Sequence, residues 1–107
     1  MSYEFMRIIL FFDLPMVTKQ EVRIYTHFRK NLIKNGYIMM QFSVYSKIFN
    51  NRESAENHIK TLMRIVPGQG QVRIMTVTET QYSRIRILIG GISKQEEKTS
   101  IQPFLQL

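Results

Sequence analysis

The stretch FMRIILFFDLP, Phe5–Pro15, decides the fold of this 107-residue chain. From Met6 to Phe12 every residue except Arg7 is apolar, without the polar alternation of a half-exposed strand. Such a run is typical of a short strand in the middle of a sheet, covered on both faces. Because proline cannot donate to a strand ladder, Pro15 ends the strand. Asp13, the only aspartate of the chain, therefore stands at the carboxyl end of a central strand.

A helix is predicted directly after this strand. The segment TKQE, Thr18–Glu21, has the spacing of a capping box, in which two side chains satisfy each other's free backbone N–H groups. The helix should end near Asn35 and Gly36, where glycine supplies the left-handed cap. Its apolar residues recur at helical spacing and predict a core stripe of Val22, Tyr25, Phe28, Leu32 and Ile33.

The middle of the chain predicts two more strands and a second helix. YIMMQFSVYSKIF, residues 37–49, is rich in β-branched and aromatic residues but too long for one typical strand, so we expect a bend near residues 41–43. Asn50 with Glu53 should cap the second helix, which PGQG at residues 67–70 ends. Its predicted apolar stripe is Ala55, Ile59, Leu62, Met63 and Val66, and Val72 to Thr78 reads as a fourth strand.

The element order β-α-β-β-α-β predicts an α+β fold, a ferredoxin-like sandwich with both helices on one side of the sheet. Residues 84–89 alternate arginine or leucine with isoleucine and predict a fifth strand that ends at Gly90-Gly91. Two helices cannot bury all the apolar sheet surface that Phe5, Phe11, Phe12 and the methionines supply. We therefore expect a homodimer with sheets packed face to face and the fifth strand crossing to the partner.

The domain prediction is a ferredoxin-like domain over residues 1–91 and a C-terminal tail over residues 92–107, either disordered or a docking segment for a partner. The chain has no cysteine, which excludes disulfides and thiolate metal sites and favours a cytosolic setting. Glu4 argues against a signal peptide, and the longest clean apolar run is far too short to cross a bilayer. A cytoplasmic protein without membrane contact is expected.

Charge points to a nucleic acid. Fifteen lysines and arginines against eight acidic residues give a net charge of +7, which favours a polyanionic partner over a merely basic soluble protein. On the first predicted helix, five residues without an acidic neighbour fall within an arc of about 80°, whereas a solvated helix face is usually of mixed charge. With the strand arginines they make the predicted backbone-binding set Lys19, Arg23, His27, Lys30, Lys34, Arg7, Arg73, Arg84 and Arg86.

Catalytic machinery is sparse. No motif joins His27 or His58 to a nucleophile, and no metal-ligand spacing or phosphate-binding glycine loop occurs. His27 reads as a phosphate contact or surface residue, and His58 as a core imidazole. Asp13 is the one carboxylate at a position where function usually lies, although an aspartate that merely ends a strand is the simpler interpretation. One carboxylate makes a poor Mg²⁺ site, but a two-fold dimer would bring a second Asp13.

Three segments give the sequence a family resemblance: MRIILFFDLP at residues 6–15, FRKNLIKNGYIMMQFSVYSK at residues 28–47 and VTETQY at residues 77–82. In this order and spacing the chain resembles the CRISPR-associated Cas-two family, in the form found in type II systems. The resemblance implies the ferredoxin-like fold and a tight homodimer whose C-terminal strand joins the partner's sheet. It also implies that the dimer sits between two dimers of the integrase Cas-one, which together insert foreign DNA as spacers into the CRISPR array.

The resemblance further implies a Mg²⁺-dependent endonuclease acting on RNA or DNA, with Asp13 of both protomers at the metal. Residues 43–45 match the family at the bend between the second and third strands. We expect a DNA-bridging component of the spacer integration complex, binding double-stranded DNA. A standalone metal-dependent nuclease is the alternative. An operator-binding regulator is disfavoured because no helix-turn-helix spacing occurs.

Overall fold

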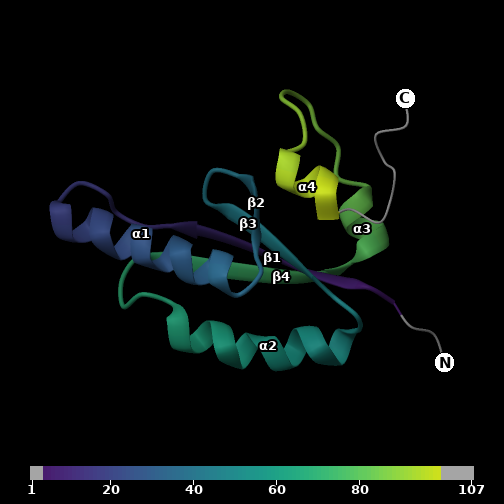
Figure 1. Cartoon of the computed structure of the whole chain (residues 1–107), viewed down its shortest axis with the longest axis horizontal. Coiled ribbons are helices and arrows are strands. Elements are labelled where there is room, and N and C mark those ends of the chain that lie inside the picture. The colour runs from purple at the N-terminus through teal and green to yellow at the C-terminus, as the bar shows by residue number, and fades with distance from the viewer. Residues whose placement is uncertain (1–3, 100–107) are drawn as a thin grey trace.

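The computed structural model in Figure 1 describes residues 4–99 and has the predicted βαββαβ order. The strands form one antiparallel sheet in the order β2-β3-β1-β4, the arrangement of a ferredoxin-like α+β fold. In chain order the elements are β1 (Met6–Asp13), α1 (Lys19–Lys34), β2 (Ile38–Gln41), β3 (Val44–Phe49), α2 (Arg52–Ile65), β4 (Gln71–Thr78), α3 (Glu79–Ser83) and α4 (Lys94–Thr99).

Strand β1 is central, as predicted, and its two faces differ. One face packs under α1 and α2, and its side chains Met6, Ile8, Leu10 and Phe12 are buried. The other face, which we call the open face, carries Arg7, Ile9, Phe11 and Asp13 of β1. The residues opposite them in register lie on the same face, among them Arg73 and Met75 of β4. Phe11 and Met75 are 37% and 51% exposed. The sequence predicts that both faces of β1 are covered, and in the single chain the open face is covered only in part.

Helix α1 begins with the predicted capping box. The Glu21 N–H donates to Thr18 Oγ1 at 3.1 Å, and Glu21 Oε1 accepts the Thr18 N–H at 3.0 Å. Tyr25, Phe28 and Leu32 enter the core as predicted, but the other two members of the predicted stripe are largely exposed. Those two residues, Val22 and Ile33, lie at the edge of the apolar arc, beyond the reach of the sheet.

Helix α2 begins one residue later than predicted. Its N-cap is Asn51, whose Oδ1 accepts the Ser54 N–H at 2.8 Å, rather than Asn50. Ala55 and Leu62 are buried, while Met63, predicted in the core stripe, is 70% exposed. Residues of α1 and the end of α2 border a groove of about 320 Å³.

Residues 84–89, predicted as a fifth strand that crosses to a partner's sheet, form no strand within the single chain, and the crossing itself stays a prediction. Residues 84–92, the C-terminal segment, leave the sheet after the short helix α3 without joining a ladder. The physical reason is that a strand exists only when a second strand pairs with it. Within the chain, α3 turns residues 84–89 away from the free edge of β4.

Helix α4 lies against the other edge of the sheet (Figure 1), where the N–H of Met39 in β2 donates to Gln95 Oε1 at 2.7 Å. The first part of the predicted tail is therefore helical and packed on the domain. The rest of the predicted docking segment, residues 100–107, lies outside the described residues. Between residues 4 and 99, no helix has both the length and the apolar character that crossing a bilayer requires.

Candidate nucleic-acid interface

Asp13 lies exposed at the end of β1, as the sequence predicts. Strand β1 can end at Asp13 because Gly70 packs against the Asp13 backbone. A Cβ added at Gly70 would lie 2.8 Å from the Asp13 carbonyl oxygen, and the φ of Gly70 is +82°. Both facts demand glycine at this position. The turn before β4 thereby fixes the position at which β1 ends, and with it the position of the Asp13 carboxylate.

A hollow of about 440 Å³ surrounds this carboxylate, and we call it the Asp13 hollow. Strand register explains its composition, because Asp13 pairs with Gln71 and Phe11 pairs with Arg73. No hydrogen bond or ion pair joins the Asp13 carboxylate to another side chain that the structure describes. The residues lining the hollow are Phe11, Phe12, Asp13, Phe42, Ser43, Val44, Gln71 and Arg73.

The turn between β2 and β3 closes one side of the hollow. The Phe12 N–H donates to the Ser43 carbonyl oxygen at 3.1 Å, which ties the turn to β1. Ser43 has a φ of 65°, a conformation that residues other than glycine seldom adopt. Phe42 is 65% exposed and stacks on Tyr25 of α1 at 5.8 Å between ring centroids. The sequence analysis did not predict Phe42 or Gln71 as site residues. An aromatic residue in a predicted bend could have indicated Phe42.

The hollow fits a hydrated divalent cation only in part. The Asp13 carboxylate and the Gln71 amide oxygen are the hard oxygen donors that Mg²⁺ prefers. However, no group of three or more acidic or histidine side chains that could hold a metal occurs among the described residues. A single chain therefore offers one carboxylate, and water, phosphate oxygens or a second Asp13 would have to complete the coordination.

The predicted basic row on α1 is exposed along its whole length. We call this set, Lys19, Arg23, His27, Lys30 and Lys34, the α1 basic row. Glu21, the one acidic residue of α1, is engaged in the helix cap, where its Oε1 accepts the N–H groups of Val17 and Thr18. These backbone hydrogen bonds, that from Thr18 first, lower the pKa of Glu21. No carboxylate that the structure describes forms an ion pair with the row.

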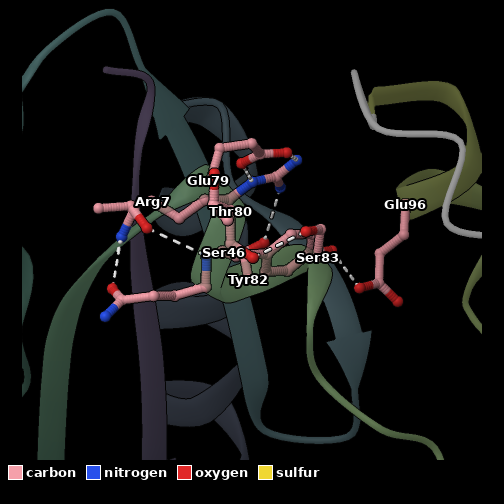
Figure 2. Close-up of polar contacts among 9 residues, drawn as sticks. Arg7, Ser46, Glu79, Thr80, Tyr82, Ser83 and Glu96 are labelled. Atoms are coloured by element: carbon pink, nitrogen blue, oxygen red, sulfur yellow. Dashed lines mark hydrogen bonds and ion pairs between the residues drawn. The ribbon is translucent and has the colours of Figure 1, made fainter. Parts of the chain in front are cut away.

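Arg7 does not belong to this interface, which corrects the sequence prediction. The side chain is 1% exposed and lies on the open face beneath α3, as Figure 2 shows. Its Nε donates to Glu79 Oε1 at 2.6 Å, its Nη2 to Glu79 Oε2 at 3.1 Å and its Nη1 to Ser46 Oγ at 3.2 Å. With the guanidinium enclosed and its hydrogen bonds made internally, Arg7 has no access to a phosphate at the surface.

The ring of Tyr82 closes this cluster from the other side. The Arg7 guanidinium carbon lies 3.9 Å from the Tyr82 ring centroid, a cation–π contact. The Tyr82 hydroxyl donates to Glu96 Oε2 at the start of α4, as Figure 2 shows. Burial and this hydrogen bond raise the pKa of Tyr82. The cluster thus links β1, α3 and α4. Two of its members, Glu79 and Tyr82, belong to the VTETQY motif of the sequence.

The remaining predicted cations lie in two separate places. Arg73 joins Asp13 in the hollow, whereas Arg84 and Arg86 lie exposed on the C-terminal segment. Helix α3, from which that segment emerges, lies at the opposite end of the sheet from the first turn of α1 (Figure 1). The structure therefore brings together the five residues of the α1 basic row, and separately Asp13 with Arg73.

Fold and surface define a small ferredoxin-like domain with one unbroken basic helix face and one exposed carboxylate at the end of its central strand. A family model described as CRISPR associated protein Cas2 matches residues 6–85. The chain belongs to the Cas2 family, the Cas-two family that the sequence motifs resemble.

Relatives support the family assignment over nearly the whole chain. A protein of Acidovorax ebreus is 44% identical over 95 residues, covering 89% of this chain and 93% of the relative. A protein of Treponema denticola is 46% identical over 85 residues, covering 79% and 84%. A protein of Parvibaculum lavamentivorans is 41% identical over 102 residues, covering 95% and 99%. Each of the three is named CRISPR-associated endoribonuclease Cas2.

Proposed function

We propose that this protein is a structural component of CRISPR adaptation. In this proposal a homodimer bridges dimers of the integrase Cas-one in the prokaryotic cytoplasm. It also holds the backbone of a captured DNA duplex for insertion into the CRISPR array. Membership of the Cas2 family supports the proposal, and the α1 basic row is the observation that carries the DNA-binding part.

The α1 basic row suits a duplex backbone better than a base sequence. Its cations project from one helix face without a carboxylate among them, and cations of this kind attract phosphates whatever the base sequence. No Phe, Tyr or Trp side chain belongs to the row, so it offers no large aromatic ring for base stacking. Binding should therefore be strong in low salt and independent of sequence.

The open face and the C-terminal segment support the homodimer. Phe5, Phe11 and Met75 expose apolar surface on or beside the open face. The free edge of β4 offers unpaired backbone groups to a strand from a second copy. Segment 84–89 has the residue pattern for that strand, and its four apolar members are exposed in the single chain: Ile85, Ile87, Leu88 and Ile89.

The proposal is tested by mixing the protein with Cas-one from the same operon, with and without duplex DNA, and measuring the mass of the complex. Log affinity for duplex should fall linearly with log salt, by roughly 0.9 per phosphate neutralised. The variant Arg23→Glu/Lys30→Glu should weaken binding to all duplex sequences alike, while Lys60→Glu/Arg64→Glu on α2 is the matched control. Equal losses in both variants, or a marked sequence preference, would contradict a role for the α1 basic row.

A metal-dependent endonuclease is the second candidate, favoured by the Asp13 hollow and by the names of the relatives. The Asp13 carboxylates of both protomers would together hold one Mg²⁺ ion, which when bound would supply a Lewis acid and an activated water. Arg73 lines the same hollow, and its guanidinium is suited to hold a phosphodiester beside that carboxylate. The Gln71 amide adds a neutral group that can orient water or substrate.

The two functions separate at Asp13. Asp13→Asn keeps the size of the side chain and removes its charge, so fold, dimer and bridging should persist while Mg²⁺-dependent cleavage is lost. A variant that still cuts with Mg²⁺ places the cleavage in another site or a contaminant. A variant that loses the dimer makes Asp13 a strand terminator and nothing more.

A further inference from the structure

A groove between α1 and the end of α2 combines an apolar floor with a cationic rim. Its volume is about 320 Å³, and we call it the α1–α2 groove. Figure 1 shows the end of α2 beside α1, where the groove lies. Neither duplex binding nor metal binding requires an apolar floor at this place. The lining residues are Arg23, Ile24, His27 and Phe28 of α1, Ile65 of α2 and Pro67 after it.

The floor of the groove is fixed by the core. Ile24 lies three and four positions before His27 and Phe28 on α1, so the three side chains share one side of the helix. Phe28 is 1% exposed and meets Phe12 edge to face, at 5.1 Å between ring centroids. Ile24 and Ile65 are half-buried. A group that enters the groove therefore meets a floor that needs little reorganisation to receive it.

The rim is cationic and has no carboxylate to balance it. Arg23 and His27, two members of the α1 basic row, line the groove, and none of the described aspartate or glutamate residues does. Neither side chain forms a hydrogen bond or an ion pair with another residue that the structure describes. A guanidinium beside an imidazole N–H offers several donors to one carboxylate. The rim is thus complementary to a negatively charged group.

The shape of the groove selects among anionic partners. Its apolar residues are recessed, so the groove receives an apolar group, whereas a membrane-binding surface inserts its own. A duplex presents phosphates and sugars and has no long apolar side chain to project into the floor. A protein segment can carry a large apolar side chain and a carboxylate one helical turn apart on the same face. A protein is therefore the partner that matches both floor and rim.

We propose that the α1–α2 groove binds an acidic segment of a partner protein. One large apolar side chain of the segment enters between Ile24 and Ile65, and a neighbouring carboxylate pairs with Arg23 and His27. Since these two cations belong to the α1 basic row, the bound segment competes with duplex for part of that row. A homodimer formed through the open face leaves the groove accessible, because the lining residues belong to α1, α2 and the connection after α2.

The test begins with a selection on the full-length protein. The probe is a library of random peptides of about 12 residues, roughly three helical turns, displayed on phage. An excess of polyglutamate removes peptides that bind through charge alone. The enriched peptides should share an aspartate or glutamate within about four positions of a leucine, isoleucine, phenylalanine or tryptophan. Enriched peptides that lack either element, or the absence of any enrichment, would overturn the proposal.

The decisive variant is Ile24→Lys, measured by fluorescence anisotropy with a labelled enriched peptide. It adds a positive charge but obstructs the apolar floor, so binding through charge alone would strengthen while anchored binding weakens. Affinity for the peptide should fall at least about 5-fold. Affinity for a hairpin duplex should not fall, which also shows that the variant is folded. Ile24→Ala, which shortens the side chain without adding charge, should weaken the peptide as well.

Val22→Lys is the matched control, because Val22 is an apolar residue of the same helix, 44% exposed and outside the groove. It adds the same charge and should leave the peptide bound at least as tightly as to the wild type. Equal losses in Ile24→Lys and Val22→Lys, or a loss in neither, would rule out the groove as the docking site.

Competition with duplex is measured separately from docking. The unlabelled peptide should displace a labelled hairpin duplex from wild-type protein. A peptide that saturates the groove and leaves the duplex bound would overturn the competition. If the peptide binds and responds to Ile24→Lys while no duplex binds at all, the docking site stands and the DNA-binding part of the proposed function fails alone.

Discussion

Gly70 shows at the scale of one residue why Asp13 stands where it does. The sequence predicts a turn at residues 67–70 but gives no sign that one glycine of that turn touches the end of β1. That contact joins positions 57 residues apart, 13 and 70, so only the folded chain reveals it. Asp13 itself, by contrast, was predictable, because its apolar strand and the proline after it are adjacent in sequence.

Gly70→Ala should lower the free energy of unfolding by about 1–3 kcal/mol, because alanine must adopt a positive φ and its Cβ meets the Asp13 carbonyl oxygen. Gly68→Ala is the matched control: an added Cβ there meets no atom within 4 Å, so we expect a change within about 0.5 kcal/mol. Urea unfolding measures both. Equal stabilities would mean that the turn relaxes freely and does not fix Asp13.

His58 gives the protein a predictable response to pH. Its Nε2 is buried without a hydrogen-bond partner among the described residues, and the ring lies 5.1 Å from Phe49 and 5.7 Å from Tyr37 between centroids. Burial lowers the pKa of His58, and the nearby charge of Lys47 lowers it further. The sequence predicts a satisfied core imidazole, whereas the structure shows a half-buried ring whose Nε2 has no hydrogen-bond partner among the described residues.

Because the pKa of His58 is lower in the folded than in the unfolded state, the unfolded state takes up a proton first as pH falls. The free energy of unfolding should therefore hold above about pH 6.5, the ordinary histidine value, and decline as pH drops through it toward the lowered pKa. His58→Gln should flatten this part of the profile, and His27→Gln, on the exposed α1 basic row, should keep it. A profile that His58→Gln leaves unchanged would assign the decline to other groups.

At the scale of the elements, local sequence patterns predict the helices α1 and α2 and the four strands. They do not predict the path of the segment after β4. The capping box at Thr18 and the alternation in β4 are complete within a few residues. The path of the chain after Thr78 depends instead on Arg7, which belongs to the first strand and pairs with Glu79 across 72 positions. An arginine inside an apolar strand was the available signal, because a buried charge requires a partner.

Helix α3 should be held on the sheet chiefly by this pair. Glu79→Ala leaves the Arg7 guanidinium buried without its counter-ion, which should cost about 3–5 kcal/mol in the free energy of unfolding. The double variant Arg7→Met/Glu79→Leu removes both charges and should recover most of that loss. A double-mutant cycle by urea unfolding gives the coupling energy, and strictly additive losses would show that the two residues act independently.

At the scale of the whole molecule, the sequence predicts the architecture but does not show what covers the open face. The βαββαβ order with helices on one side follows from chain order and short connections. Whether apolar residues on the other face are covered, and by what, depends on association. In the single chain the C-terminal segment exposes apolar side chains, and Leu88 and Ile89 are each 94% exposed.

The homodimer should therefore depend on segment 84–89. Wild-type protein is expected at twice the chain mass of 12.8 kDa in sedimentation or light scattering. Ile87→Lys/Ile89→Lys places charges where the segment would pack on a second copy, and should yield folded monomer, because the core contains neither residue. Met63→Lys, at another exposed apolar position, on α2, should leave the dimer intact. A dimer that survives the double substitution would have to use a surface other than this segment, and the free edge of β4 would then need a different cover.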